Sequence, residues 1–101
     1  MTDPQPTAIV FVHGLWLTGI ESGLLLQRLG SEMHCKAHYF HYPSVSAPMS
    51  QILTDLRSFV TSLAATTVHL VGHSLGGIVV LRLLETYDDL PPGRAVLLGA
   101  P

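Results

Sequence analysis

Short apolar runs alternate with longer segments of helical spacing along this chain, and this alternation limits the folds open to it. The runs with the length and composition of strands are residues 8–12, 37–42, 67–71 and 95–99. The segments predicted to be helical are residues 22–30, 50–63 and 78–87. Strands that alternate with helices form a mostly parallel sheet that the helices cover. We therefore predict an α/β protein with about four strands and flanking helices.

The charge balance bears on the partners of the chain. Its 101 residues include 5 Lys and Arg against 7 Asp and Glu, which gives a formal net charge of −2. This balance does not favour nucleic acid or an anionic membrane as a partner. Charged residues make up 12% of the chain, about half the usual share. We therefore expect part of its apolar surface to be buried against something else.

The start of the chain, MTDPQPT, is polar and contains no basic residue, so we expect a flexible arm at residues 1–7 and a domain at residues 8–101. The apolar run after the arm is too short for a signal peptide. Residues 59–81 lack charged side chains, but their Ser, Thr, His and Gly content argues against a transmembrane segment. Cys35 is the only cysteine and cannot form an intramolecular disulfide. We expect a cytoplasmic protein.

A serine stands at the turn between the third predicted strand and the helix after it. The sequence GHSLGG at residues 72–77 contains the pattern G-x-S-x-G. Such a turn presents the serine hydroxyl at a sharp bend, and the glycines two positions before and after it leave room for the bend. Free N–H groups at the start of the helix face negative charge that develops on a bound carbonyl oxygen. The pattern predicts a nucleophile at Ser74 and an oxyanion donor at the N–H of Leu75.

A second motif, FVHGLW at residues 11–16, lies at the end of the first predicted strand. The backbone N–H of Leu15 would supply a second hydrogen bond to the oxyanion. Both motifs follow strands, and ligands of parallel sheets bind at the carboxyl ends of the strands. We call the turn at residues 72–77 the elbow and the segment after the first predicted strand the oxyanion loop. The residues predicted to shape them are His13, Gly14, Gly72, His73, Gly76 and Gly77.

With both motifs in order, the chain resembles the α/β-hydrolase family, and its lipase- and esterase-like members in particular. VFVHGLW at residues 10–16 looks like their third strand and oxyanion loop, and HLVGHSLGG at residues 69–77 looks like their nucleophile elbow. AVLLGAP at residues 95–101 looks like the strand that follows. The resemblance implies part of a three-layer α/β-hydrolase fold and a serine hydrolase that attacks a small-molecule carboxylic ester through Ser74. No cofactor is expected.

The family order of catalytic residues is Ser, then an acid, then a His that acts as the base. No His follows Ser74 in this chain. Of the later acids, Glu85 would lie roughly 13 Å beyond Gly76 along the helix, and Asp88 and Asp89 further still. We therefore expect the amino-terminal part of a hydrolase domain, nearly inactive alone, whose last strand exposes an apolar edge. Self-association or a complementing chain would cover that edge.

Alternative functions predict different behaviour from this chain. A non-catalytic remnant would bind an acyl ligand or a protein partner through the exposed sheet edge and would lack esterase activity. A phosphate-binding loop is disfavoured, because Ile78 stands where that loop needs lysine. No metal site is expected, because His38 and His41 would project to opposite faces of a strand.

Overall fold

The computed structural model describes residues 7–13, 35–42 and 46–98. Its elements are β1 (Thr7–Val12), β2 (Lys36–Phe40), α2 (Met49–Ser62), β3 (Thr67–His73), α3 (Leu75–Thr86) and β4 (Ala95–Leu98). The strands form one sheet in the order β2-β1-β3-β4, and each neighbouring pair is parallel. The predicted α/β architecture with a parallel sheet is therefore confirmed. The helix predicted at residues 22–30 lies outside the described residues, and Thr7 begins β1 rather than ending the predicted arm.

Some element boundaries differ from the predicted ones, and the differences have physical reasons. β3 continues to His73, and α3 begins at Leu75, three residues earlier than predicted. The sequence predicts a turn over residues 72–77, but Gly72 belongs to β3, and Gly76 and Gly77 belong to α3. β2 ends at Phe40, two residues earlier than predicted, because its partner β1 ends opposite it at Val12.

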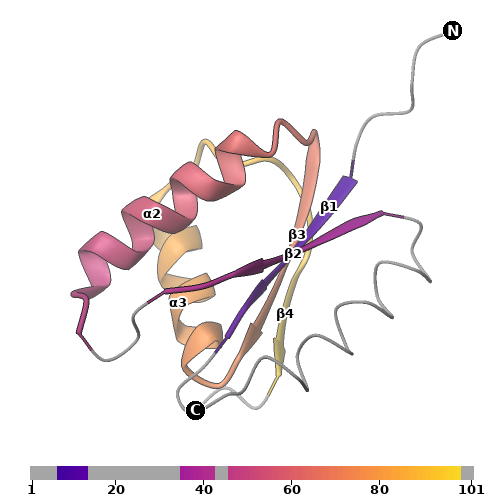
Figure 1. The fold of residues 1–101 in the computed structure, drawn as a ribbon. Helices are drawn as coiled ribbons and strands as arrows, with labels where there is room; N and C mark the ends of the chain where they lie inside the picture. The colour runs from indigo at the N-terminus through magenta and orange to yellow at the C-terminus, as the bar shows by residue number, and fades with distance from the viewer. Residues whose placement is uncertain (1–6, 14–34, 43–45, 99–101) are drawn as a thin grey trace, which may run out of the picture.

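Helices α2 and α3 pack on the same face of the sheet (Figure 1). Val10 of β1 points into this layer, where Leu56 of α2 and Leu83 of α3 are fully buried. The buried positions of α2 recur at helical spacing, and they are Ile52, Leu53, Leu56 and Val60. On the opposite face of β1, Ile9 and Phe11 are buried as well. Burial on both faces explains why β1 is a continuous apolar run rather than an alternating one.

Strand β4 forms one edge of the sheet and is the least buried of the four described strands. Its Val96 and Leu97 side chains are 47% and 38% exposed. Leu81 and Leu84 on α3 are also exposed. An apolar edge strand offers unpaired backbone groups to another strand. The self-association or complementing chain expected at this edge stays a prediction.

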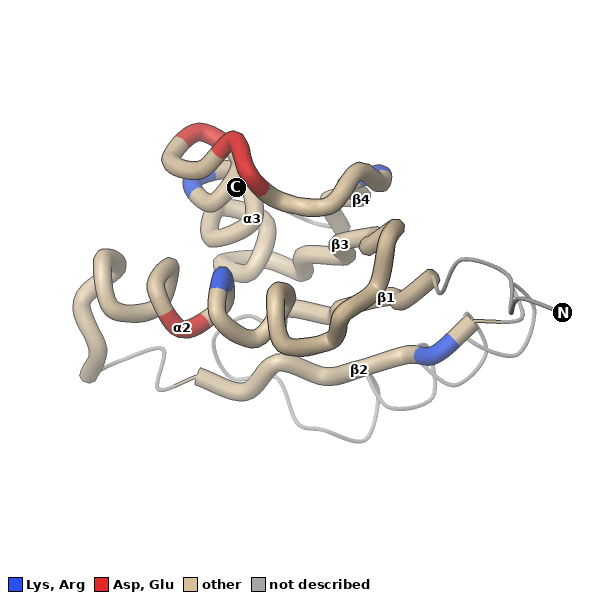
Figure 2. Tube along the Cα trace, turned by 90° about the horizontal axis from the view of Figure 1, so that it is seen from above, with Lys and Arg blue, Asp and Glu red and all other residues tan. Residues whose placement is uncertain are grey.

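Charged side chains are spread over the described part of the chain (Figure 2). Lys and Arg stand on α2 and α3, at the start of β2 and just before β4, while acidic residues stand on α2, near the end of α3 and in the segment after it. This part of the chain therefore shows no concentrated basic surface. Neither α2 nor α3 has the length and apolar character that a membrane-crossing helix needs.

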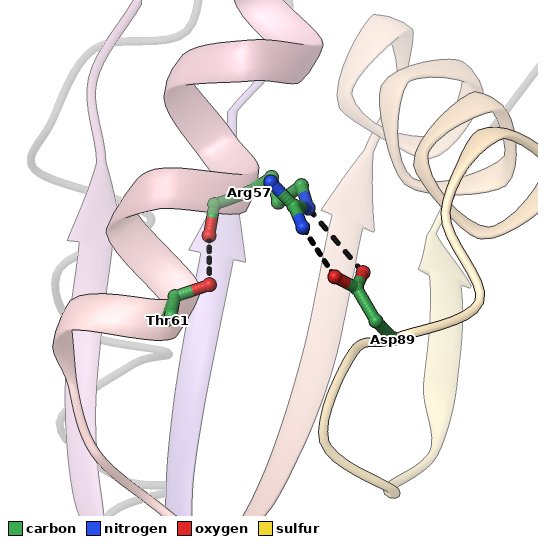
Figure 3. A network of polar contacts seen from close by, with 3 residues as sticks. All are labelled: Arg57, Thr61 and Asp89. Atoms are coloured by element: carbon green, nitrogen blue, oxygen red, sulfur yellow. Dashed lines mark hydrogen bonds and ion pairs between the residues drawn. The ribbon is translucent and has the colours of Figure 1, made fainter.

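An ion pair joins α2 to the segment after α3 (Figure 3). Arg57 on α2 donates two hydrogen bonds to the carboxylate of Asp89, one of them from Nε at 3.3 Å. The guanidinium carbon also lies 4.8 Å from the ring centre of Tyr87. The Thr61 hydroxyl, one turn further along α2, donates a hydrogen bond to the Arg57 carbonyl oxygen. The hydrogen bonds from Arg57 lower the pKa of Asp89 below its ordinary value of 3.8.

Replacing Asp89 with asparagine is expected to lower stability slightly at neutral pH and to have no effect in acid. Because the pKa of Asp89 is lower in the folded state, the carboxylate stabilises the fold above its unfolded pKa, and this contribution is lost as the pH falls through the folded pKa. The pair is exposed, so its effect is small and weakens with salt. Urea unfolding of both proteins at neutral and acid pH measures the difference. An equal difference in acid would show that the ionised carboxylate is not its cause.

Candidate active site

The carboxyl ends of β1, β2 and β3 are level, and the candidate site lies along this edge of the sheet. Val12 pairs with Phe40 of β2 and with Gly72 of β3. His13 and Ser74 therefore leave neighbouring strands at the same edge. Parallel sheets bind their ligands at this edge. The two motifs that the sequence singled out for chemistry thus follow adjacent strands.

Ser74 has a backbone conformation that residues other than glycine rarely adopt. Its φ is 57° and its ψ is −121°. Ala64 is the other non-glycine residue of positive φ in the described ranges, and it follows α2, where a left-handed residue commonly ends a helix. Ser74 instead precedes α3, where helix formation does not require this conformation. Backbone strain of this kind costs about 1–3 kcal/mol and is concentrated at functional sites.

The hydroxyl of Ser74 does not stabilise the helix that follows it. Serine is preferred at a helix N-terminus because its side-chain oxygen accepts a hydrogen bond from an N–H of the first turn. Ser74 occupies that position before α3, yet its side chain makes no such bond. The residue is held through its backbone, since its N–H donates to the Leu98 carbonyl and its own carbonyl accepts from the Gly77 N–H, both at 2.9 Å. The usual structural explanation for a serine at this position therefore does not apply.

The glycines on either side of Ser74 are required by close approach of the backbone. A side-chain carbon at Gly72 would lie 2.6 Å from the carbonyl oxygen of Gly76. A side-chain carbon at Gly76 would lie 2.0 Å from the carbonyl oxygen of Val12 and 2.7 Å from that of His13. Neither position has room for a carbon atom. The start of α3 is therefore in direct contact with the end of β1.

His13 is held by Tyr42, a residue that belongs to neither sequence motif. The Tyr42 N–H donates to Nε2 of His13 at 3.3 Å, and the Tyr42 hydroxyl donates to the His13 carbonyl oxygen at 2.5 Å. The two rings stack with their centres 4.3 Å apart. Burial raises the pKa of Tyr42 to about 12, so the hydroxyl keeps its proton and remains a donor. The lone pair of Nε2 of His13 is therefore directed at the Tyr42 N–H.

The remaining predicted site residues fall partly inside the described ranges. Leu75 is the first residue of α3, so its N–H lies at the start of the helix. His73 is half-buried at the end of β3, and its buried Nδ1 has no hydrogen-bond partner among the described residues. Gly14 and Leu15 lie outside those residues. The second oxyanion donor therefore stays a prediction.

His38 in β2 and His41 just after it lie on opposite faces of the sheet, as predicted from strand geometry. The ring centre of His38 lies 6.1 Å from that of Phe59 on the helix-covered face. His41 stacks on Tyr39, which packs on the other face, with ring centres 4.3 Å apart. Within the part of the chain that the structure describes, no group of three or more His, Cys, Asp or Glu side chains could hold a metal ion. Burial raises the pKa of the Cys35 thiol, which favours its unreactive protonated form.

A parallel sheet with a strained serine between a strand and a helix, flanked by glycines in backbone contact, defines an α/β protein of the hydrolase type. The chain belongs to the alpha/beta hydrolase family, whose model matches residues 9–101. No curated protein and no solved structure matches the chain. The chemistry of this member is therefore proposed from the site itself.

Proposed function

We propose that this protein is a serine hydrolase of the lipase or esterase type, in which Ser74 attacks the carbonyl carbon of a small-molecule carboxylic ester. The observation that carries the proposal is the positive φ of Ser74, 57°, at a serine that does not cap its helix. Strain that stabilises no local structure is explained by a need to present the hydroxyl at the edge of the sheet. Membership of the alpha/beta hydrolase family supports the same chemistry.

The proposed reaction proceeds by covalent catalysis. Oγ of Ser74 forms a bond to the carbonyl carbon, and negative charge develops on the carbonyl oxygen. The N–H of Leu75, at the positive end of α3, donates a hydrogen bond to that oxygen, and the N–H of Leu15 donates a second. A general base takes the hydroxyl proton and passes it to the leaving alcohol. Water then cleaves the acyl–serine ester and releases the acid.

The base and acid of the triad are proposed to come from polypeptide beyond these 101 residues. No His follows Ser74 in the chain. Within the described ranges, His13 and His69 each already accept a hydrogen bond from a backbone N–H. Asp89 is paired with Arg57 beyond the far end of α3. A further segment, either continuous with this chain or supplied by a second chain, would complete the triad.

Reaction with a fluorophosphonate in the presence of added imidazole tests the proposal. Free imidazole replaces the missing histidine base, so we expect labelling at one residue, Ser74, at a rate that rises with imidazole concentration. Intact mass analysis and peptide mapping locate the adduct.

Exposed serines of α2 provide the internal control for this reaction. Ser58 is exposed and has no strained backbone, so it should remain unlabelled. Labelling of Ser58 as fast as Ser74, or a folded protein whose Ser74 never reacts with imidazole present, would contradict the proposed function.

A further inference from the structure

We propose that Tyr42 is a positioning residue of this site. It holds His13 and thereby fixes the backbone contact between the end of β1 and the first turn of α3, next to Ser74. The inference rests on the proposed function, because it assigns Tyr42 a task in the same site. It adds a residue that neither the G-x-S-x-G pattern nor the His-Gly motif contains.

Tyr42 contacts His13 in three independent ways. Its N–H binds Nε2 of the imidazole, its hydroxyl binds the carbonyl oxygen, and its ring stacks on the imidazole. The side chain and the backbone of His13 are therefore both fixed by one residue. The hydrogen bond to the carbonyl oxygen also restricts the direction in which the His13 carbonyl group points.

The carbonyl of His13 is also in contact with the elbow. Its oxygen and that of Val12 occupy the space where a side chain at Gly76 would stand. The His13 carbonyl therefore contacts both the hydroxyl of Tyr42 and the first turn of α3. Displacement of this carbonyl would shift the first turn of α3, in which Leu75 follows the nucleophile directly.

The hydroxyl of Tyr42 is not explained by core packing. Tyr42 is 7% exposed and packs beside Phe40, with ring centres 5.8 Å apart, so a phenylalanine would fill the same space. A buried hydroxyl stabilises a fold only when it is hydrogen-bonded, and this one is bonded to the His13 carbonyl. Tyr39 offers a comparison, because its ring centre lies 5.6 Å from that of His13 while its hydroxyl bonds to none of the described residues.

The first test compares Tyr42→Phe with Tyr39→Phe by amide NMR of the 101-residue protein. Both changes keep the aromatic ring and remove one hydroxyl, so ring-current effects are retained. We expect the amide signals of Ser74, Leu75 and Gly76 to move in Tyr42→Phe and to stay in place in Tyr39→Phe. Elbow signals that do not move in Tyr42→Phe would overturn the inference. This readout needs no enzymatic activity.

The second test measures the rate of Ser74 labelling by the fluorophosphonate with imidazole present. We expect Tyr42→Phe to react about tenfold more slowly, as for the loss of one hydrogen bond, and Tyr39→Phe to react at the unchanged rate. An unchanged rate in Tyr42→Phe, with a reactive unsubstituted protein, would overturn the inference and leave the proposed function standing. An unsubstituted protein that never reacts would overturn the function, and the NMR comparison alone would then decide the role of Tyr42.

A measurement on the unsubstituted protein decides the matter if Tyr42→Phe does not fold. In mildly alkaline buffer, the ¹⁵N shifts of His13 should show a protonated Nδ1 and an unprotonated Nε2, because Nε2 accepts the Tyr42 N–H. Protonation at Nε2 instead would remove that acceptor and overturn the inference.

Discussion

Replacing Gly76 with alanine is expected to destabilise the fold by about 2 kcal/mol or more, although alanine is the better helix former. The new methyl carbon would lie 2.0 Å from the carbonyl oxygen of Val12, and that oxygen belongs to the backbone of a fully buried strand residue. Either α3 or the end of β1 must move. Since a displacement of about 1 Å near reacting groups can cost roughly a hundredfold in rate, labelling of Ser74 should fall by a similar factor.

Urea unfolding and fluorophosphonate labelling of Gly76→Ala measure these two effects. Arg82→Ala is the matched control, because it also introduces alanine into α3, at an exposed position. The control should change neither stability nor labelling appreciably. A Gly76→Ala protein as stable and as reactive as the control would show that α3 does not depend on its contact with β1.

The sheet and its helices could be predicted from the sequence because they follow from local patterns of burial. β1 is apolar along its length since both of its faces are buried, and α2 shows a single apolar stripe since one of its faces packs on the sheet. The positions of the glycines also indicate where the elbow lies. The reason for Gly76 could not be predicted, because a glycine can either end a helix or allow close packing. Its close approach to the carbonyl oxygens of Val12 and His13 shows that close packing is the reason.

The contacts around the site could not be predicted, because they join residues that are distant in sequence. Tyr42 and His13 are 29 positions apart, and Arg57 and Asp89 are 32 positions apart. No local pattern marks such pairs. Tyr42 stands among other aromatic residues at a strand end, which equally indicates a core residue. Its hydroxyl reaches the carbonyl oxygen of His13 only because β1 and β2 are parallel and end at the same level.

The backbone of Ser74 was also beyond local prediction. Serine before a helix is ordinary, since it caps helices, so residue type alone gives no sign of strain. The G-x-S-x-G pattern locates the turn, and the structure adds that its serine has φ of 57° and makes no cap. The overall fold therefore holds Ser74 in a backbone conformation that serine does not prefer. Such disagreements between local preference and the overall fold are expected at functional sites.

Replacing Ser74 with glycine is expected to stabilise the protein while abolishing its reaction with the fluorophosphonate. Glycine adopts positive φ without steric cost, so the substitution releases strain of about 1–3 kcal/mol. The greater freedom of glycine in the unfolded chain offsets about 0.4–1 kcal/mol of that gain. The net expected change is a stabilisation of about 1 kcal/mol. Urea unfolding measures it, and intact mass analysis shows the loss of the adduct.

Ser74→Ala is the matched variant for this experiment. Alanine removes the hydroxyl but keeps the Cβ atom that makes positive φ unfavourable, so it should abolish labelling without the gain in stability. The difference in unfolding free energy between the two variants therefore isolates the strain at this residue from the loss of the hydroxyl. A glycine variant no more stable than the alanine variant would mean that the backbone of Ser74 is not strained, and the observation that carries the proposed function would fail. The two variants together therefore test whether the backbone conformation of Ser74, the proposed nucleophile, lowers the stability of the fold.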